Sequence, residues 1–301
     1  MGNTLKNKKI LVTGGKGYLG SFLVESLREK GADIYIISIE AENSDHNFPI
    51  DITNFDALDA VIKKIQPDIV YHLAASISRN RDFGIFDNML KVNVNGTFNL
   101  LKSLLETNCQ QFIFTSSSEI YGNNVSPFHE DLVPMPVSPY SATKVMAENL
   151  IKTFSQQYKK NYTILRLFNF FGENMSDDFF ISQMVNSLKK GQDFLMTKGE
   201  QTRDFLYVKD VVSALTIVAE NTNAYNDTFN VCSGKGTSLS SLASVVNKQV
   251  KTRATVKLGA LPYRENEVWE MIGSSVKIKE KLGFIPEHTL SEGLERLINS
   301  K

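Results

Sequence analysis

The sequence has 301 residues, of which 42% are apolar and 22% are charged, and its 33 basic residues equal its 33 acidic residues in number. This composition predicts a folded, soluble chain with a large core and excludes a disordered one. A net charge of zero gives no overall field for nucleic acid or an anionic membrane, so we expect neither as a partner.

Cysteine, histidine and the N-terminal residues exclude further classes of protein. Cys109 and Cys232 fit no disulfide or redox motif, so we expect both in the core of a protein from a reducing compartment. The four histidines lack metal-ligand spacing, so we expect no metal site. The apolar run 10–12 is too short for a signal peptide or membrane span, which predicts a cytoplasmic protein.

Short apolar runs alternate with amphipathic ones in the first half of the chain, a pattern typical of a parallel sheet with helices on both faces. Gly31 and Pro67 give stop signals for the first two helices. We expect strands at 10–12, 34–37, 69–73, 112–114 and 163–167, and helices at 18–29, 55–65, 86–108 and 141–159. This order predicts a Rossmann-type, doubly wound α/β fold.

The regular alternation ends after residue 168. An irregular segment at 172–178 precedes a helix at 181–189 and a turn at Gly199. We therefore expect a dinucleotide-binding domain made of residues 1–168 and 203–232. Residues 169–202 and 233–301 are expected to form a smaller C-terminal substrate-binding lobe.

A glycine-rich loop follows the first expected strand. Gly14, Gly17 and Gly20 allow a tight turn and let backbone N–H groups approach a pyrophosphate at the start of a helix. A lone glycine triplet is weak evidence, but this one follows a strand and opens a helix. The expected contacts of the loop with a dinucleotide cofactor include Lys16, Tyr18 and Leu19.

The second expected strand ends at Ser38, where an acidic residue would select NAD by binding the ribose hydroxyls. Serine leaves room for a 2′-phosphate, and Lys16 could supply charge to it, which favours NADP. Glu40 could restore a preference for NAD, so NAD stays open. Asp51 and Ile52 are expected to contact the adenine.

Tyr140 and Lys144 stand four residues apart in an expected helix, so both side chains lie on one helix face. The ammonium favours the phenolate, which allows the tyrosine to exchange protons with a sugar or alcohol oxygen near neutral pH. Alone, such a pair is most often a solvated helix face, but here it accompanies the glycine loop.

Together these motifs resemble the extended short-chain dehydrogenase/reductase family of nucleotide-sugar epimerases, dehydratases, decarboxylases and reductases, from about residue 8 to about residue 295. Thr13–Gly20 matches its TGxxGxxG motif, and Tyr140 with Lys144 matches its YxxxK motif. Further matches are Leu73, Ala74 and Ala75 beside the cofactor, Asn93 near the active site, and Ser117 as the catalytic hydroxyl in Thr115–Gly122.

The resemblance implies roles for these residues. Tyr140 is the acid and base, Lys144 lowers its pKa and binds the nicotinamide ribose, and Ser117 hydrogen-bonds the reacting oxygen. Without the resemblance, three consecutive serines after a strand would indicate a polar turn.

The resemblance also implies a site for a nucleotide-diphosphate sugar. Asn169, Arg203 and Arg264 stand where the family binds the substrate phosphates, and a guanidinium fork suits phosphate oxygens. Ion pairing with Asp204 and Glu265 is the alternative for the two arginines. Phe171-Gly172-Glu173 departs from the family's usual Tyr-Gly-Pro, which changes the expected shape of the sugar pocket.

The sequence indicates the family more clearly than it indicates the reaction. Ser118-Glu119 lacks the aspartate usual in glucose-type 4,6-dehydratases but keeps the glutamate, which is either catalytic or bonded to nearby backbone. Residues 261–268, with Ser38 and Lys16, favour an NADPH-dependent reductase of the 4-keto group of an NDP-4-keto-6-deoxyhexose. The alternatives are a UDP-glucose-type 4-epimerase, a dehydratase or decarboxylase, and a non-catalytic dinucleotide sensor.

The helices expected at 86–108 and 141–159 resemble those that the family packs into a four-helix interface, which implies a homodimer.

Overall fold

The structure is a computed structural model that describes residues 4–78, 82–264 and 267–300. Its largest element is a seven-stranded parallel sheet with strand order β10-β6-β5-β4-β1-β2-β3. The strands are β1 (Lys9–Thr13), β2 (Asp33–Ile37), β3 (Asn47–Phe48), β4 (Ile69–His72), β5 (Gln111–Ser117), β6 (Asn161–Leu167) and β10 (Asp227–Val231). The chain order reverses between β1 and β4, which creates a crevice at their carboxyl ends.

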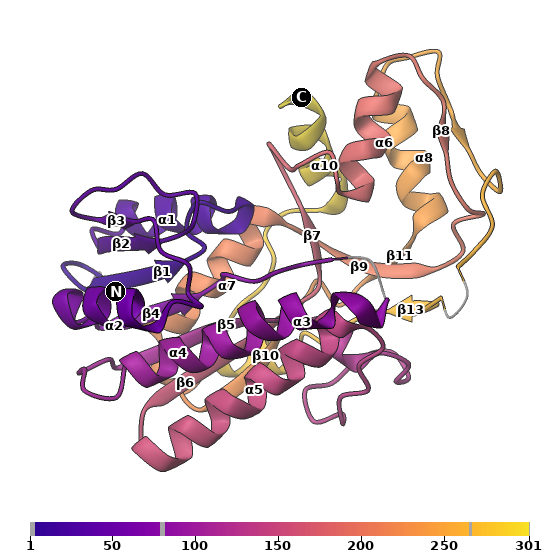
Figure 1. The fold of residues 1–301 in the computed structure, drawn as a ribbon. Helices are drawn as coiled ribbons and strands as arrows, with labels where there is room; N and C mark the ends of the chain where they lie inside the picture. The colour runs from indigo at the N-terminus through magenta and orange to yellow at the C-terminus, as the bar shows by residue number, and fades with distance from the viewer. Residues whose placement is uncertain (1–3, 79–81, 265–266, 301) are drawn as a thin grey trace.

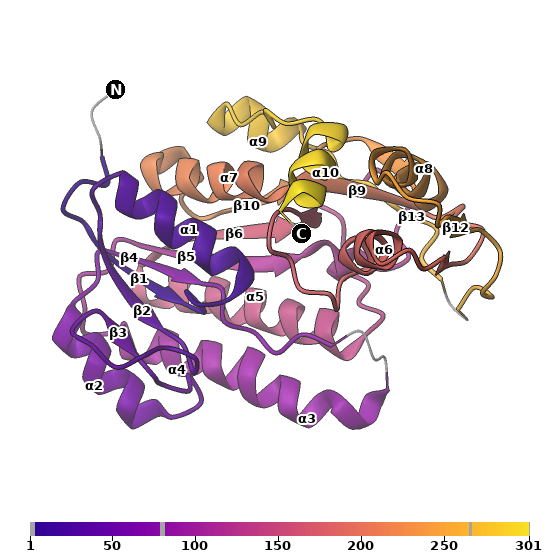
Figure 2. The same ribbon diagram turned by 90° about the horizontal axis from the view of Figure 1, so that it is seen from above.

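Helices cover both faces of this sheet, as Figures 1 and 2 show. One face carries α1 (Tyr18–Glu29) and α7 (Val208–Glu220), and the other carries α2 (Phe55–Ile65), α4 (Gly96–Ser103) and α5 (Pro139–Tyr158). Successive side chains of β1 point to opposite faces, so Ile10 and Val12 enter one core and Leu11 enters the other. The expected doubly wound α/β fold is confirmed.

A second, smaller sheet is built around β9 (Thr202–Tyr207), which pairs with β7 (Asn169–Phe171), β11 (Gly236–Ser238) and β13 (Glu270–Met271). Beside it lie the two-stranded β8 (Phe194–Leu195) and β12 (Val256–Lys257), and the helices α6 (Phe180–Lys189), α8 (Leu239–Gln249) and α10 (Leu290–Asn299). These elements share a core of their own.

Two segments lie elsewhere than the sequence predicts. Residues 203–207, expected in the dinucleotide-binding domain, belong to β9 in the small sheet. α9 (Val276–Leu282), expected in the lobe, packs through Ile278 and Leu282 into the core that covers the large sheet. The division of the chain into two domains by residue number stays a proposal.

Local signals set the first two helices. α1 ends before Gly31, whose φ of 71° is the left-handed conformation that glycine adopts readily, and α2 ends at Gln66, directly before Pro67. α5 begins two residues before its expected start at residue 141, because Ser138 caps it and Pro139 occupies its first position.

The helix expected at 86–108 is wrong in its details. The structure has a 3₁₀ turn (Phe83–Ile85), α3 (Phe86–Met89), a π-helical stretch (Leu90–Asn95) and α4, which ends at Ser103. Leu104 and Leu105 instead form tight turns with carbonyls three residues back. Two other 3₁₀ turns, η3 (Ser118–Tyr121) and η4 (Thr222–Ala224), complete the described elements.

Cys109 and Cys232 are both buried and unpaired, as predicted. In the described ranges, no helix combines the length and apolar character needed to cross a membrane.

Candidate active site

A cleft of about 540 Å³ opens at the carboxyl ends of the central strands. Most of the predicted site residues line it: Gly14, Gly17, Tyr18, Leu19, Gly20, Ser38, Asp51, Ile52, Leu73, Ala74, Ala75, Ser117, Glu119, Tyr140, Lys144 and Asn169. Residues far apart in the sequence meet here because parallel strands end at the same edge of a sheet.

The glycine loop fits a dinucleotide pyrophosphate. Gly14 has a φ of 72°, and a Cβ there would lie 2.8 Å from the backbone nitrogen of Ala74. A Cβ at Gly20 would lie 2.1 Å from the carbonyl oxygen of Gly14. Only glycine permits this close approach of helix, loop and neighbouring strand. The first N–H groups of α1 lack partners within the helix and face the cleft end of the loop, which suits phosphate oxygens.

The other end of the cleft is acidic. Ser38 and Glu40 both line it, whereas Lys16 is exposed and is not among the lining residues. The charge that would favour a 2′-phosphate is therefore absent from the place where the sequence predicts it. Asp51 accepts a hydrogen bond from the backbone N–H of Thr53 (2.9 Å), which fixes the turn that brings Asp51 and Ile52 to the cleft.

A buried hydrogen-bond chain joins the carboxyl ends of β1 and β4 to the helical segment around Asn93. Thr97 Oγ1 donates to the carbonyl of Asn93, so it accepts from His72 Nε2 (2.9 Å), and His72 Nδ1 in turn accepts from Thr13 Oγ1 (2.7 Å). Burial, with Lys144 nearby, lowers the pKa of His72 to about 3, so the ring is neutral at neutral pH. Thr13 Oγ1 also accepts from the N–H of Ala74.

Asn93 does not line the cleft, in contrast to its expected contact with the cofactor. Its Oδ1 accepts from the N–H of Ser76 (2.7 Å), and its Nδ2 donates to the carbonyl of Ser76 and to Thr143 Oγ1 (both 3.0 Å). Asn93 thus ties the segment after β4 to α5. The π-helical stretch turns its side chain inward for this purpose.

Ser117 and Tyr140 meet in the cleft from different elements. Ser117 ends β5, and its Oγ accepts the N–H of Glu119 (3.1 Å), which leaves the hydroxyl proton as a donor. Tyr140 lies in the first turn of α5 and hydrogen-bonds Ser117. Lys144 follows one turn later and donates to the carbonyl of Thr115 (2.8 Å).

The electrostatics of Tyr140 differ from the expectation. Burial raises the pKa of Tyr140, the Glu119 carboxylate raises it further, and only the hydrogen bond with Ser117 lowers it. The expected lowering by Lys144 is therefore wrong for the protein alone. Burial also lowers the pKa of Lys144 to about 7, so its charge is partly lost at neutral pH.

Glu119 is exposed in the cleft and accepts a hydrogen bond from Ser138 Oγ (3.3 Å), at the N-terminus of α5. Ser118, the residue before it, is buried and donates to Met271 Sδ (3.3 Å). The Ser118 hydroxyl is therefore not poised for acid chemistry on a substrate.

The three residues expected to bind substrate phosphate are not brought together. Asn169 lines the cleft, but Arg203 pairs with Glu267 (2.7 Å) and donates to the carbonyl of Thr202 (2.9 Å) on the small sheet. Arg264 is exposed and is not a lining residue. Of the alternative ion-pair partners, Asp204 instead accepts hydrogen bonds from Ser233, Gly234 and Gly273, and Glu265 lies outside the described residues.

Several lining residues have no expectation from the sequence. Phe168 and Phe170 flank Asn169, so their place beside a predicted contact was the available signal. Met175, Phe179 and Met271 come from the small lobe, and no local pattern marks them. Among the described residues, no group of three His, Cys, Asp or Glu side chains is placed to hold a metal ion.

With this geometry established, the comparisons decide the family. The model of the NAD dependent epimerase/dehydratase family matches residues 10–232. The chain belongs to this family. It is an enzyme family, and the resemblance to extended short-chain dehydrogenases/reductases is confirmed.

The family's members differ in reaction. The chain is 33% identical to the putative UDP-glucose 4-epimerase of Methanocaldococcus jannaschii, over 96% of this chain and 97% of the relative. It is 28% identical to the GDP-6-deoxy-D-talose 4-dehydrogenase of Aggregatibacter actinomycetemcomitans, over 91% of each chain. Among solved structures, the UDP-glucuronic acid 4-epimerase of Bacillus cereus, in complex with UDP-glucuronic acid and NAD, matches with a TM-score of 0.87 at 26% identity over 97% of this chain and 98% of that one.

Proposed function

We propose that this protein is an NAD-dependent 4-epimerase of a nucleotide-linked hexose. The observation that carries the proposal is the cleft in which Ser117 and Tyr140 meet beside the glycine loop, while Glu40 lines its far end. Reduction of a 4-keto-6-deoxy sugar nucleotide is the second candidate, supported by the talose 4-dehydrogenase among the relatives.

The choice of NAD over NADP follows from charge. A 2′-phosphate would bring negative charge to the end of the cleft that Glu40 lines, and Lys16 is not placed there to compensate it. The basis for an NADPH-dependent reductase is thereby weakened, because an exchangeable NADPH was one of its two supports, beside residues 261–268. A bound NAD that is not consumed suits an epimerase, whose product has the same oxidation state as its substrate.

In this proposal, side chains of the protein transfer the proton of the C4 hydroxyl and bind the C4 oxygen. Bound NAD supplies the hydride acceptor and donor at C4 of the sugar. Tyr140 Oη accepts the proton of the C4 hydroxyl and later returns it, so its protonation is unchanged over a turnover. The Ser117 hydroxyl donates to the same oxygen and holds it against Tyr140. Lys144 and the loop glycines hold the dinucleotide, and Asn169 faces the substrate side.

The nucleotide and the assembly are parts of the same proposal. The names of several relatives contain UDP sugars, which supports a uridine diphosphate as the carrier of the hexose. A glucose-type 4,6-dehydratase is less well supported, because Ser118 is bonded to Met271 where an acid would stand. We also propose a homodimer through α4 and α5.

The test is to purify the protein, release bound nucleotide with acid, and incubate the protein with UDP-glucose, UDP-N-acetylglucosamine and UDP-glucuronic acid. We expect NAD to be released, and one substrate to be converted to a mixture of C4 epimers without net change in NADH. Stoichiometric oxidation of NADPH by a 4-keto-6-deoxy nucleotide sugar, with no epimerisation of any hexose, would establish the second candidate instead.

Replacing Tyr140 with Phe tests the proposed proton transfer. We expect turnover to fall by about 10²- to 10⁴-fold, because the acid and base is lost, while the dissociation constant of NAD stays near that of the wild type. Binding is measured by quenching of protein fluorescence. A Tyr140→Phe variant with full activity would refute the role of Tyr140.

A further inference from the structure

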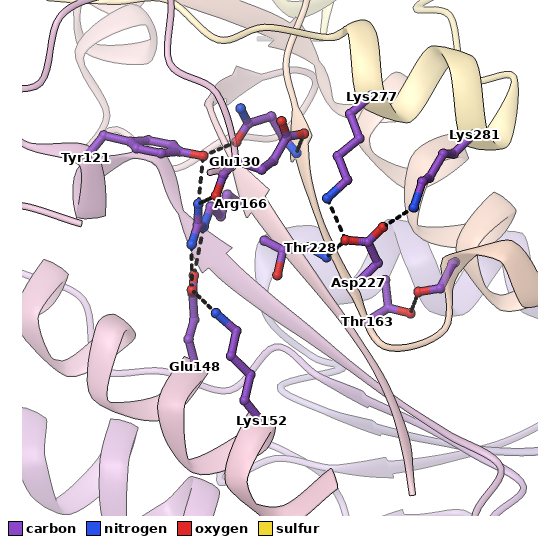
Figure 3. Close-up of polar contacts among 12 residues, drawn as sticks. Tyr121, Glu130, Glu148, Lys152, Thr163, Arg166, Asp227, Thr228, Lys277 and Lys281 are labelled. Carbon is purple, nitrogen blue, oxygen red and sulfur yellow. Dashed lines mark hydrogen bonds and ion pairs between the residues drawn. The ribbon is translucent and has the colours of Figure 1, made fainter. Parts of the chain in front are cut away.

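Behind the cleft, the guanidinium of Arg166 on β6 is buried in a network of hydrogen bonds (Figure 3). Nε and Nη2 donate to the two carboxylate oxygens of Glu148 (3.1 and 2.9 Å), in the fork geometry that fixes both partners. Nη1 donates to Tyr121 Oη and to the carbonyl of Glu130 (both 2.9 Å). Tyr121 Oη donates in turn to Asn230 Oδ1 (2.7 Å) on β10.

Two partners of Arg166, Tyr121 and Glu148, lie on elements that adjoin or carry the proposed catalytic groups. Tyr121 ends η3, the turn that begins directly after Ser117. Glu148 lies on α5, one helical turn beyond Lys144 and two beyond Tyr140. One rigid, planar group thus joins the segment behind the serine hydroxyl to the helix that holds the phenol and the ammonium.

We propose that Glu148 and Arg166 are positioning residues of the active site, which fix η3 against α5 and present a carboxylate to Lys144. This inference rests on the proposed catalytic use of Ser117, Tyr140 and Lys144. Neither residue lines the cleft, so neither is a catalytic residue.

The surroundings of Lys144 make the charge of Glu148 matter. The ammonium lies 4.6 Å from the centre of the buried Phe114 ring and 5.7 Å from that of Tyr140, which lines the cleft. The neighbouring His72 is neutral, as described above. Burial lowers the pKa of Lys144, and the Glu148 carboxylate acts against it. Arg166 and, at the surface, Lys152 (3.6 Å) form ion pairs with the buried Glu148 side chain.

Glu148→Gln tests the inference, because it keeps the shape of the side chain and removes its charge. Asp227→Asn is a matched control: Asp227 lies on the neighbouring strand β10, pairs with Lys277 and Lys281 of α9, and is bonded to neither η3 nor α5 among the residues shown (Figure 3). We expect Glu148→Gln to lower kcat by about 10- to 100-fold with KM and NAD affinity close to those of the wild type. Asp227→Asn should leave kcat unchanged even where it lowers Tm.

A second measurement follows Lys144 itself and needs no turnover. The 13Cε resonance of Lys144, assigned by its loss in Lys144→Met, is titrated by NMR in wild type, Glu148→Gln and Asp227→Asn. We expect the pKa of Lys144 to be lower in Glu148→Gln than in the wild type and unchanged in Asp227→Asn. In active enzyme, the alkaline limb of the pH profile of kcat should move to lower pH in the same variant.

The outcomes are separable. A lower kcat and a lower pKa of Lys144 in Glu148→Gln, with neither change in Asp227→Asn, would support the inference. A wild-type pKa of Lys144 in Glu148→Gln, or losses of kcat equal to those of Asp227→Asn, would overturn it. Absence of any nucleotide-sugar turnover in the wild type would instead refute the proposed function, and the NMR titration would still decide the place of Glu148. Arg166→Lys, which keeps the charge but loses the fork, should lower kcat without moving this titration to the same extent.

Discussion

We expect Glu119 to influence the pH at which Tyr140 loses its proton. Its carboxylate raises the pKa of Tyr140, so Glu119→Gln should lower that pKa. If Tyr140 acts as the base, its deprotonated form then appears at lower pH, and the acidic limb of the pH profile of kcat moves to lower pH. The measurement is kcat for epimerisation between about pH 6 and 11, a range that includes the usual tyrosine pKa of about 10.

Glu40→Gln is the matched control, because Glu40 lines the opposite end of the same cleft. Glu40→Gln should change the affinities for NAD and NADP without shifting the acidic limb of the pH profile of kcat. Complete loss of activity in Glu119→Gln would contradict the electrostatic role and assign Glu119 a direct chemical one, as in a dehydratase.

The lowered pKa of Lys144 makes the free energy of unfolding depend on pH. In the folded protein burial lowers the pKa of Lys144 to about 7, while the unfolded value is about 10.4. Between these values the unfolded chain binds more protons, so this group makes the free energy of unfolding rise with pH, and its full cost applies below about pH 7. Lys144→Met removes that cost. We therefore expect the variant to be more stable than the wild type at pH 7, with an advantage that shrinks towards pH 10.

Urea unfolding at several pH values measures this difference, which one titrating group limits to about 1.4 kcal/mol per pH unit. Lys152→Met, at an exposed lysine of the same helix, should show no such trend. A constant difference between wild type and Lys144→Met would show that Lys144 does not titrate in this range.

At the level of single residues, motifs predict chemistry better than they predict contacts. The meeting of Ser117, Tyr140 and Lys144 in one cleft was predictable because it depends on spacing within one strand end and one helix. Arg203 and Asn93 were not, because their partners Glu267 and Ser76 are brought to them by tertiary structure. The direction of the Tyr140 pKa depends on burial, which spacing does not contain.

Among the elements, α5 is expected to contribute to the proposed activity through its first turn. Ser138 and Ser141 form a reciprocal cap there, on either side of Tyr140 in the sequence, and Thr289 and Glu292 form the equivalent cap of α10. Ser138→Ala and Thr289→Ala should each lower the free energy of unfolding by about 1 kcal/mol. Only Ser138→Ala should also lower kcat, because fraying of this turn displaces the phenol. Equal kcat values in the two variants would contradict this.

The elements also show where local signals end. Gly31 and the Gln66-Pro67 pair stop α1 and α2 where the sequence predicts, since such residues act on their own backbone. The helix type of residues 86–103 depends on tertiary contacts instead. Asn93 makes its hydrogen bonds from the π-helical stretch, so the apolar periodicity could predict a helix there but not the change from α-helix to π-helix.

For the whole molecule, the proposed dimer gives a direct test. Phe98 on α4 and Met146 on α5 are exposed large apolar side chains, 51% and 40% accessible, on adjacent helices of one face. Phe98→Glu should convert a dimer to monomer in light scattering, because a charge would be buried at the interface. Ile285→Glu, at an exposed apolar residue beyond α9, should leave the mass unchanged. A monomeric wild type would refute the proposal.

The overall architecture was predictable because the βα alternation and the glycine loop determine a doubly wound sheet. The part of the cleft formed by the small lobe was not. Met175, Phe179 and Met271 belong to the lobe around β7, β9 and β13, whose pairings join residues 36 and 68 positions apart on the chain. The identity of the sugar depends on this part.

The sheet has two edges, and the chain protects them differently. β3 is only two residues long, which offers little backbone for pairing with another molecule. β10, the other edge strand, is held by α9, whose Lys277 and Lys281 pair with Asp227. During synthesis α9 leaves the ribosome some fifty residues after β10 begins. The edge of β10 is therefore exposed until α9 has been made, and the chain can misassemble through it during that interval.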